Sequence, residues 1–540
     1  MKRVIVIIVV ISLLCGCIAG FAGCKNKQKE GVISIRNLYF ENWSADQGDS
    51  VTKFIEDKFG VTFETSSYSF NNWTTQVTGD VNGNQVPDVF QADVKPENLN
   101  NTYIYWAEGG VVKALPDELL ADETSSRWPY LQSMIKSTKD VSSMLYKGKL
   151  YGIPVSRNIN RAEEAEFAPF TYIYRRDIAR DRNLAGFQEN DVYTWEQFET
   201  LLRSFKAINM SLGDAEWPGA FPSVANYYKT ATHCFTFDAN GAVVNNYFTE
   251  DYMAGLNKAK SYVDGKLYYQ GQQQSAGKSD AEPVEKKYYD GTLGVFYDNF
   301  SLANYLKIRK QMLKTNGITE ENIDDATALM KVMGPTGSNS EGKYALEEQE
   351  DWFSMTFLNA DISTSKMEKI LDIMNWLISP EGTEMALYGI EGVDYEKNGD
   401  EVTLIESNLW AKNNKGEYID SPNGAKYLRY MVTLGHDIMG KDPVLNASKT
   451  QKKAYTILKN WDSFMKEANA AGKLTILKED PRIKWMTTSK KLEYQGKILD
   501  DANTKTVKYA FGSISYSAYQ SSMTDSRWRE VLAEINANLN

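Results

Sequence analysis

The feature that most constrains the fold is an alternation of strand-like and helix-like segments early in the chain. Residues 32–39 are largely apolar and β-branched and predict a strand. Residues 51–59 space their apolar side chains as a helix does and stop at Gly60. Residues 61–65 and 87–90 predict two further strands. Strands separated by helix-length segments favour a parallel, doubly wound α/β sheet, which binds ligands at the carboxyl ends of its strands.

Three later segments predict helices. Thr194 and Gln197 have the spacing of a capping box, ahead of a helix that continues to about Phe205. Residues 366–378 and 527–539 repeat apolar side chains at helical spacing. Helices and strands are therefore mixed along the whole chain.

The first 30 residues predict secretion followed by lipid attachment. A basic pair precedes an apolar run over residues 4–23, and polar residues follow Cys24. Small residues before Cys24 match a bacterial lipobox. We interpret residues 1–23 as a lipoprotein signal peptide, Cys24 as the lipidated residue and residues 24–30 as a tether. A permanent transmembrane anchor and an earlier lipobox ending at Cys17 stay open as alternatives; in each case the body faces the outside.

Cysteine use and charge narrow the class of protein. Of the four cysteines only Cys234 lies beyond Cys24, so a chain lipidated at Cys24 forms no intramolecular disulfide and must rely on its core. The net charge of −11 excludes nucleic acid as a suitable partner. The chain has 12 Trp, 32 Tyr and 22 Phe. Most belong in the core, but the excess of Tyr and Trp also suits a sugar-binding surface.

Motifs for metals, nucleotides and hydrolysis are incomplete in this sequence. Residues 80–88 are rich in oxygen ligands, but glycine falls at the fourth position of this stretch and no glutamate closes a calcium loop. A polar turn is the favoured interpretation. His233 and His436 lie far apart, which is unlike the spacing of zinc ligands. Without a Walker A motif or a nucleophile elbow, the sequence predicts no metal, no cofactor and no catalytic residue.

Seven short motifs follow one another along the chain. They are residues 87–90, 107–112, 148–154, 174–177, 291–296, 334–337 and 376–382. Together with the lipobox, this ordered set resembles the family 1 extracellular solute-binding proteins of sugar ABC transporters, in the large lipoprotein subgroup of Gram-positive bacteria. Each motif alone is weak. The set is typical of the family and does not indicate the ligand.

The resemblance implies a two-lobe α/β fold of the periplasmic-binding-protein type, with a hinge and a ligand cleft between the lobes. Lobe 1 would comprise residues 31–152 plus approximately 333–380. Lobe 2 would comprise residues 153–332 plus approximately 381–540. A ligand that contacts both lobes only in the closed form binds that form more tightly, and this difference in affinity determines the fraction of closed molecules.

The resemblance also implies partners and a location. The protein would be a monomer, held by Cys24 at the extracellular face of the cytoplasmic membrane. It would capture an oligosaccharide and deliver it to the membrane permease subunits of an ABC importer. ATP hydrolysis would belong to another subunit.

The candidate ligand-binding residues follow predicted strands or the first hinge crossing, or lie at positions that the family resemblance suggests. They are Tyr39, Asn42, Trp43, Asp93, Arg157, Asn158, Trp217, Tyr297, Asp298, Asn299 and Trp352. Trp43 is the preferred stacking platform, with a core tryptophan as its alternative. Asp93 is suited to accept sugar hydroxyls or to be a solvated loop acid. Trp352 fits the core equally well.

Three other functions stay open at this point. A binding protein for a peptide or another solute would use the same strand ends. A secreted glycoside hydrolase needs two carboxylates about 5–9.5 Å apart in a cleft. An adhesin or lectin would have a shallow site that does not close.

Overall fold

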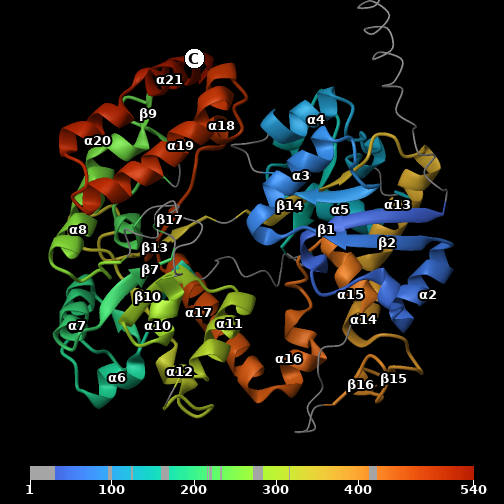
Figure 1. The fold of residues 1–540 in the computed structure, drawn as a ribbon, viewed down its shortest axis with the longest axis horizontal. Helices are drawn as coiled ribbons and strands as arrows, with labels where there is room; N and C mark the ends of the chain where they lie inside the picture. Colours follow the sequence, from blue (N-terminus) through green and yellow to red (C-terminus); the bar gives the residue numbers. More distant parts are fainter. Residues whose placement is uncertain are drawn as a thin grey trace, which may run out of the picture.

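The structure is a computed structural model. It describes residues 31–94, 100–122, 126–157, 159, 170–215, 217, 222–231, 234–271, 284–315, 317–348, 350–412 and 423–539. Two α/β lobes lie side by side (Figure 1). The predicted signal peptide, Cys24, the tether, Asn158 and His233 lie outside the described residues. Within the described ranges, no helix is both long and apolar enough to span a membrane.

The first lobe is built on a five-stranded sheet in the order β2-β1-β3-β14-β4. Its members are β1 (Val32–Asn37), β2 (Thr62–Ser67), β3 (Val89–Ala92), β4 (Gly152–Ser156) and β14 (Trp352–Leu358). β1 pairs in parallel with β2 and β3, and β14 runs antiparallel to both β3 and β4. The parallel arrangement predicted for the first three strands is confirmed. β14 enters this sheet from a distant part of the sequence.

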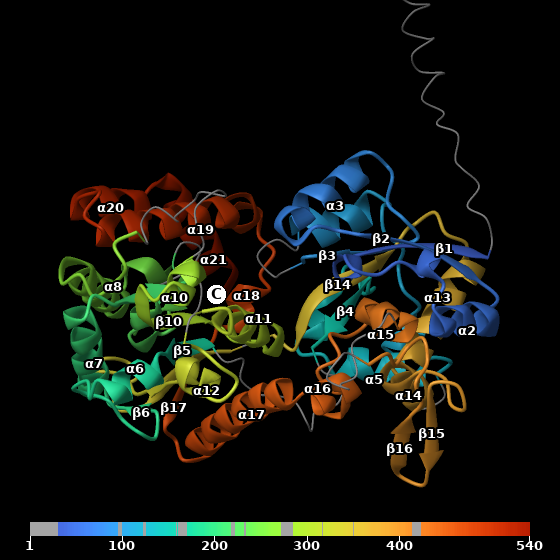
Figure 2. The ribbon, with the colours of Figure 1, turned by 60° about the horizontal axis from the view of Figure 1, so that its bottom comes forward.

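Helices surround the first sheet, and the predicted helix over residues 51–59 is α2. The Asp49 carboxylate accepts from the Thr52 amide at 2.9 Å, and Gly60 ends the helix at φ +60°. The helices of this lobe are α2 (Ser50–Phe59), α3 (Trp73–Asn82), α4 (Tyr105–Glu108), α5 (Pro129–Ser137), α13 (Thr364–Leu377), α14 (Pro380–Tyr388), α15 (Gly424–Leu428) and α16 (Pro443–Ala447). Figure 2 shows a hairpin, β15 (Tyr395–Asn398) and β16 (Glu401–Leu404), projecting from the lobe.

The second lobe is built on a four-stranded mixed sheet in the order β11-β5-β10-β7. Its strands are β5 (Phe170–Tyr174), β7 (Ser211–Asp214), β10 (Leu293–Asn299) and β11 (Ala328–Leu329). β10 runs parallel to β7 and antiparallel to β5. Two-stranded pairs add β6 (Val192–Tyr193) with β12 (Lys331–Val332), β8 (Phe235–Phe237) with β9 (Val243–Asn245), and β13 (Tyr344–Glu347) with β17 (Leu474–Leu477).

Helices make up most of the second lobe. They are α6 (Arg176–Asp181), α7 (Trp195–Ala207), α8 (Glu250–Asp264), α10 (Val284–Tyr289), α11 (Leu302–Met312), α12 (Ile323–Ala326), α17 (Lys449–Ala470), α18 (Pro481–Lys484), α19 (Ser489–Ala510), α20 (Tyr516–Met523) and α21 (Ser526–Leu539). The capping box predicted at Thr194 and Gln197 is present at the start of α7. The other two predicted helices correspond to α13 and α21.

The buried side chains show how the chain is divided. One core collects residues from segments 33–153 and 352–438, and two adjoining cores collect residues from 172–346 and 454–535. The sequence-based division placed residues 333–346 in lobe 1 and 381–438 in lobe 2, but here each packs in the opposite lobe. The chain thus passes between the lobes three times, between Ser156 and Phe170, between Glu347 and Trp352, and at about Ser448.

A fourth connection between the lobes is made by side chains at the end of α18. The Lys484 ammonium lies 3.4 Å from the Asp140 carboxylate and also pairs with Glu350. The Trp485 indole N–H donates to Asp140 at 2.9 Å. The buried Lys491 ammonium donates to three carbonyls at the end of α18, which fixes this helix in the second lobe. The α18 contact therefore braces the lobes near the second crossing.

The oxygen-rich residues 80–88 direct their carboxylates to cationic side chains. Asp80 accepts two hydrogen bonds from the Arg36 guanidinium at 2.8 and 3.0 Å. Asp88 is 1% exposed and accepts from the Lys366 ammonium at 2.7 Å. In the part of the chain that the structure describes, three or more potential metal ligands never gather in one place. These carboxylates stabilise the first lobe by joining β1, α3 and α13.

Replacing Lys366 by methionine tests that role. Lys366→Met leaves the Asp88 carboxylate buried without its ammonium partner, so the free energy of unfolding should fall by about 3–5 kcal/mol in urea titrations. Lys58→Met is the matched control, because the Lys58–Glu381 pair is partly exposed, with 34% and 56% of the two side chains accessible. The control should lose less than about 1 kcal/mol. Equal losses in the two variants would contradict the structural role of Asp88.

Candidate functional site

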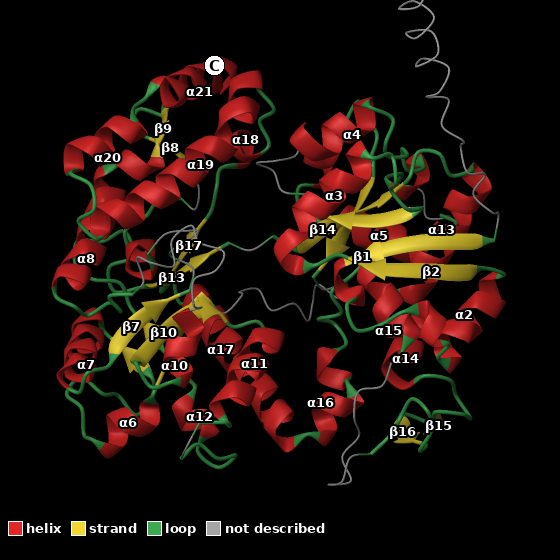
Figure 3. Ribbon diagram, in the orientation of Figure 1, coloured by secondary structure: helices red, strands yellow, loops and turns green. Residues whose placement is uncertain are grey.

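The carboxyl ends of β1, β3 and β4 form one edge of the first sheet, and this edge faces the second lobe. The chain leaves the first lobe directly after β4 and returns directly before β14, so two of the three crossings start or end at this edge. Figure 3 shows the arrowheads of β1 and β2 pointing toward the second lobe. This is the location that the strand-end rule predicts for a ligand site.

Four aromatic side chains, here called the edge aromatics, meet at this edge: Tyr39, Trp73, Phe353 and Tyr430. The Tyr39 and Tyr430 rings stack with centroids 4.6 Å apart, and those of Trp73 and Phe353 stack at 6.0 Å. Tyr39 and Phe353 are 6.4 Å apart, which joins the two pairs. The Arg157 guanidinium lies 5.7 Å from the centre of the Phe353 ring. Trp73 is buried and the other three are half-buried, so the cluster keeps accessible ring surface.

Polar groups surround the edge aromatics. The Gln91 amide donates to the Tyr430 carbonyl at 3.3 Å, and the Arg157 Nε donates to the Glu350 carbonyl at 2.8 Å. The Tyr39 hydroxyl keeps its proton at neutral pH and can donate a hydrogen bond, and burial raises its pKa further. Burial and, to a smaller extent, the nearby Arg157 lower the pKa of His436 to about 4. The His436 imidazole is therefore neutral at pH 7 and can both donate and accept a hydrogen bond.

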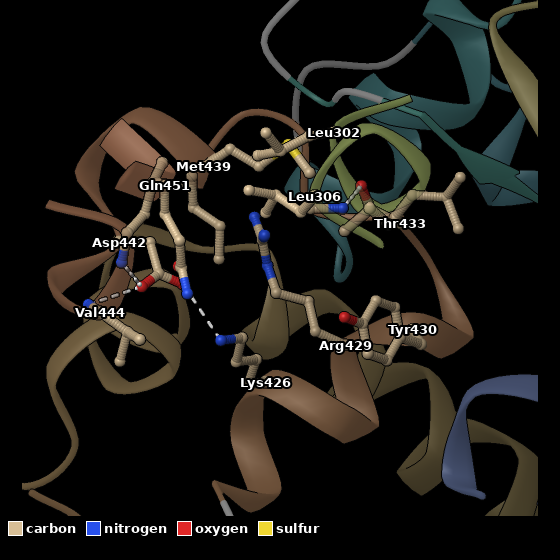
Figure 4. Close-up of a pocket in the computed structure, with 15 residues that line it drawn as sticks. Leu302, Leu306, Lys426, Arg429, Tyr430, Thr433, Met439, Asp442, Val444 and Gln451 are labelled. Atoms are coloured by element: carbon tan, nitrogen blue, oxygen red, sulfur yellow. Dashed lines mark hydrogen bonds and ion pairs between the residues drawn. The ribbon is translucent and has the colours of Figure 1, made fainter. Parts of the chain in front are cut away.

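A pocket of about 310 Å³ lies between the lobes next to the edge aromatics (Figure 4). Leu302, Ala303 and Leu306 line it from α11 of the second lobe. The first lobe contributes residues between Lys426 and Leu445, and Gln451 contributes from the first turn of α17. Since Tyr430 lines this pocket and also stacks on Tyr39, the pocket adjoins the edge aromatics. We call the two together the interlobe site.

Opposite charges are paired within the first-lobe wall of the pocket. The Lys426 ammonium lies 3.1 Å from the Asp442 carboxylate. The Arg429 guanidinium lies 2.7 Å from Asp437 and donates its Nε to the Leu377 carbonyl at 3.2 Å. Both side chains of the Arg429–Asp437 pair are buried. The wall therefore combines apolar surface with ion pairs that are already formed.

The carboxyl end of β10 brings Tyr297, Asp298 and Asn299 to the corresponding edge of the second sheet. The Tyr297 hydroxyl accepts from the Asn226 amide at 3.1 Å, and Tyr297 lines a small cavity of about 20 Å³ within this lobe. The Asp298 carboxylate accepts from the Asn304 amide at 3.0 Å. Burial raises the pKa of Asp298. Tyr297 and Asp298 thus make hydrogen bonds inside their own lobe.

Of the residues predicted from the sequence, the structure brings Tyr39 and Arg157 together in the interlobe site. Asp93 follows β3 at the same edge and is half-buried. Asn42 is exposed in the turn after Tyr39. The roles of all four in ligand binding stay predictions.

The three predicted tryptophans are buried. Trp43 is 3% exposed and stacks on Tyr427 with ring centroids 5.2 Å apart. Trp217 is 0% exposed and lies against Tyr268 in the second lobe. Trp352 is 3% exposed, at the start of β14. Each indole packs in a lobe core, the alternative that the sequence left open for Trp43 and Trp352.

Several residues of the interlobe site were not predicted. Phe353 directly follows the predicted Trp352. Neighbouring side chains of a strand point to opposite faces, so if Trp352 lies in the core, Phe353 points away from it, and the sequence could have indicated this. Trp73 is the first residue of α3, in the connection that follows the carboxyl end of β2, and the strand-end rule could have indicated it as well. Tyr430 and the pocket residues 426–445 come from a late segment that carries no local sign of reaching the first sheet.

Comparisons with solved structures match the fold over nearly the whole chain. A crystal structure of the alginate-binding protein AlgQ2 without calcium ion has a TM-score of 0.61 and 14% identity, covering 94% of this chain and 97% of that one. The Streptococcus pneumoniae ABC-transporter substrate-binding protein FusA, in complex with kestose, has a TM-score of 0.59 and 12% identity, covering 94% and 98%. An HMO-binding, ABC-transporter-associated solute-binding protein from Bifidobacterium longum infantis has a TM-score of 0.58 and 13% identity, covering 94% and 98%.

At these identities the likeness shows the fold, and the expected two-lobe α/β architecture is confirmed. No protein-family model and no curated protein sequence matches the chain. The three similar proteins are binding proteins.

The low pKa of His436 gives a test of its surroundings. The unfolded chain takes up a proton at this residue as the pH falls through about 6.5, while the folded protein does so only near pH 4. The free energy of unfolding should therefore decrease between pH 6.5 and 4, and less so in His436→Gln. Denaturant titrations of both proteins at pH 7 and 4.5 measure this difference. The same decrease in both would show that His436 is not held neutral.

Proposed function

We propose that this protein captures a carbohydrate, an oligosaccharide, outside the cell and delivers it to an ABC importer. The observation that carries this proposal is the interlobe site, in which accessible aromatic rings and a pocket lined by both lobes adjoin each other. Aromatic rings stack on the C–H faces of sugars, and hydrogen-bonding groups at the edge suit the hydroxyls. The similar proteins bind alginate, kestose and HMO respectively, and these ligands are carbohydrates.

Binding would work through closure of the two lobes. We propose that they comprise residues 31–156 with 350–447, and residues 170–346 with 449–539, which follows the buried cores. The three crossings and the α18 contact restrict their relative motion to a rotation near Glu350. A ligand that contacts the edge aromatics and α11 together interacts better with the closed form. The difference in its affinity for the two forms then determines the fraction of closed molecules, and the importer recognises the closed form.

The alternatives predict different experimental outcomes. Purified protein is incubated with neutral and acidic oligosaccharides and with peptides, and binding is followed by calorimetry and small-angle X-ray scattering. We expect carbohydrate binding, a decrease in radius of gyration and no new products by chromatography. Turnover would instead indicate a glycoside hydrolase, peptide binding another class of importer ligand, and binding without compaction a lectin. No residue is proposed to be catalytic.

Phe353→Ala tests the stacking surface. Removing the central ring of the edge aromatics should lower carbohydrate affinity about tenfold or more, since a well-placed aromatic contact contributes roughly 0.5–1.5 kcal/mol beyond the area it buries. Phe54→Ala is the matched control, because Phe54 is a half-buried ring of the same lobe that packs on Trp376, on α13. Calorimetry should show unchanged affinity for the control. Equal affinities of Phe353→Ala and wild type would remove the edge aromatics from the site.

The lipid anchor is the remaining part of the proposal. We propose that Cys24 carries the lipid and holds the protein, as a monomer, at the outer face of the cytoplasmic membrane. Cys24→Ala should release the protein into the medium, whereas Cys17→Ala should leave it with the membrane fraction. Cell fractionation and immunoblotting measure both. Release by Cys17→Ala alone would move the lipidated residue to Cys17.

A further inference from the structure

We infer that the interlobe site selects a neutral oligosaccharide over one built from uronic acids. This inference rests on the proposed carbohydrate-binding function and names the chemical class of its ligand. It follows from the charges in the pocket wall rather than from the fold, because a protein that binds the polyuronate alginate shares the same fold.

The two cations that line the pocket are already neutralised by the protein. Lys426 is paired with Asp442, which in turn accepts hydrogen bonds from the amides of Val444 and Leu445 at 2.8 and 3.1 Å. Arg429 is 1% exposed and is held by Asp437 and by the Leu377 carbonyl. Neither cation can turn to a ligand carboxylate without leaving its own carboxylate unpaired.

The rest of the described pocket wall carries no cation: its polar residues Tyr430, Thr433 and Gln451 are uncharged, and most of the others are apolar. Its apolar part comprises Leu302, Ala303, Leu306, Leu434, Ile438, Met439, Val444 and Leu445. Moving a ligand carboxylate from water to such a wall carries a large desolvation cost unless a cation and hydrogen bonds compensate for it. A neutral sugar has a smaller cost, because its C–H faces contact apolar side chains and desolvating a hydroxyl costs far less than desolvating a carboxylate.

The sheet edge that carries the edge aromatics, next to the pocket, adds no net positive charge. Arg157 is the cation there, but Asp93 lies at the same sheet edge with the opposite charge, and the pKa of His436 leaves its imidazole neutral at pH 7. The described residues around the interlobe site therefore provide no excess of positive charge.

Calorimetry with size-matched ligands tests the inference directly. The wild-type protein is titrated with neutral gluco-, manno- and fructo-oligosaccharides and with oligouronates of the same length, at low ionic strength where charge effects are strongest. We expect a neutral ligand to bind at least tenfold more tightly than any oligouronate. Tighter binding of an oligouronate would overturn the inference and leave the proposed function intact. Binding of no carbohydrate at all would overturn the proposed function itself.

A charge variant tests the proposed cause. Asp442→Asn removes the described anionic partner of Lys426 and keeps a residue that caps the start of α16 equally well. Oligouronate affinity should rise about tenfold, since a ligand carboxylate can then accept a charge-assisted hydrogen bond from the Lys426 ammonium. The matched control is Glu384→Gln, which frees Lys397 near the β15–β16 hairpin, outside the pocket. It should leave oligouronate affinity unchanged, and an equal change in the two variants would overturn the role of the Lys426–Asp442 pair.

Discussion

The insertion of β14 between β3 and β4 is the constraint on which the first lobe and the site depend. The strand arrives from the second lobe and supplies the hydrogen bonds that both neighbours need, so the first sheet cannot be completed without the second crossing. The packing there is close: a Cβ at Gly152 would lie 2.8 Å from the Phe357 ring and 3.2 Å from the Met355 sulfur. The same insertion places Phe353 beside Tyr39 and Arg157. The second crossing, the first-lobe core and the proposed ligand surface thus share one strand.

The aromatic side chains divide between two tasks according to burial. The largest ones, including Trp43, Trp217 and Trp352, fill the cores of the lobes. This is consistent with stability that comes from the cores, since Cys234, the one cysteine among the described residues, is buried and forms no disulfide there. The accessible stacking surface is made instead by half-buried Tyr39, Phe353 and Tyr430. The aromatic excess therefore supported the prediction of a sugar ligand without indicating which rings would be accessible to it.

Local patterns in the sequence were enough for the elements that fold from neighbouring residues. The first strands, α2 and the capping box of α7 depend on side-chain spacing and capping within about ten residues, and the structure shows all of them. The strand-end rule also led to Tyr39, and the expected hinge crossing led to Arg157. Long-range packing was not visible: nothing local in residues 381–438 indicates that they return to the first core, or that Tyr430 stacks on Tyr39. The pocket consists mainly of such residues, so its existence could not be predicted.

Ion pairs also determine what closure would cost. When two lobes approach, any unpaired charge on the facing walls loses its hydration, and the loss must be compensated by the ligand. Here the first-lobe wall pairs its own cations, and the facing part of α11 presents Leu302, Ala303 and Leu306. Closure over a neutral, amphipathic ligand would therefore bury surfaces that need no further charge compensation. An anionic ligand would have to break the Lys426–Asp442 or the Arg429–Asp437 ion pair. Since Asp442 also caps α16 and Asp437 holds Arg429, the same two carboxylates would affect both the stability of the first lobe and the choice of ligand.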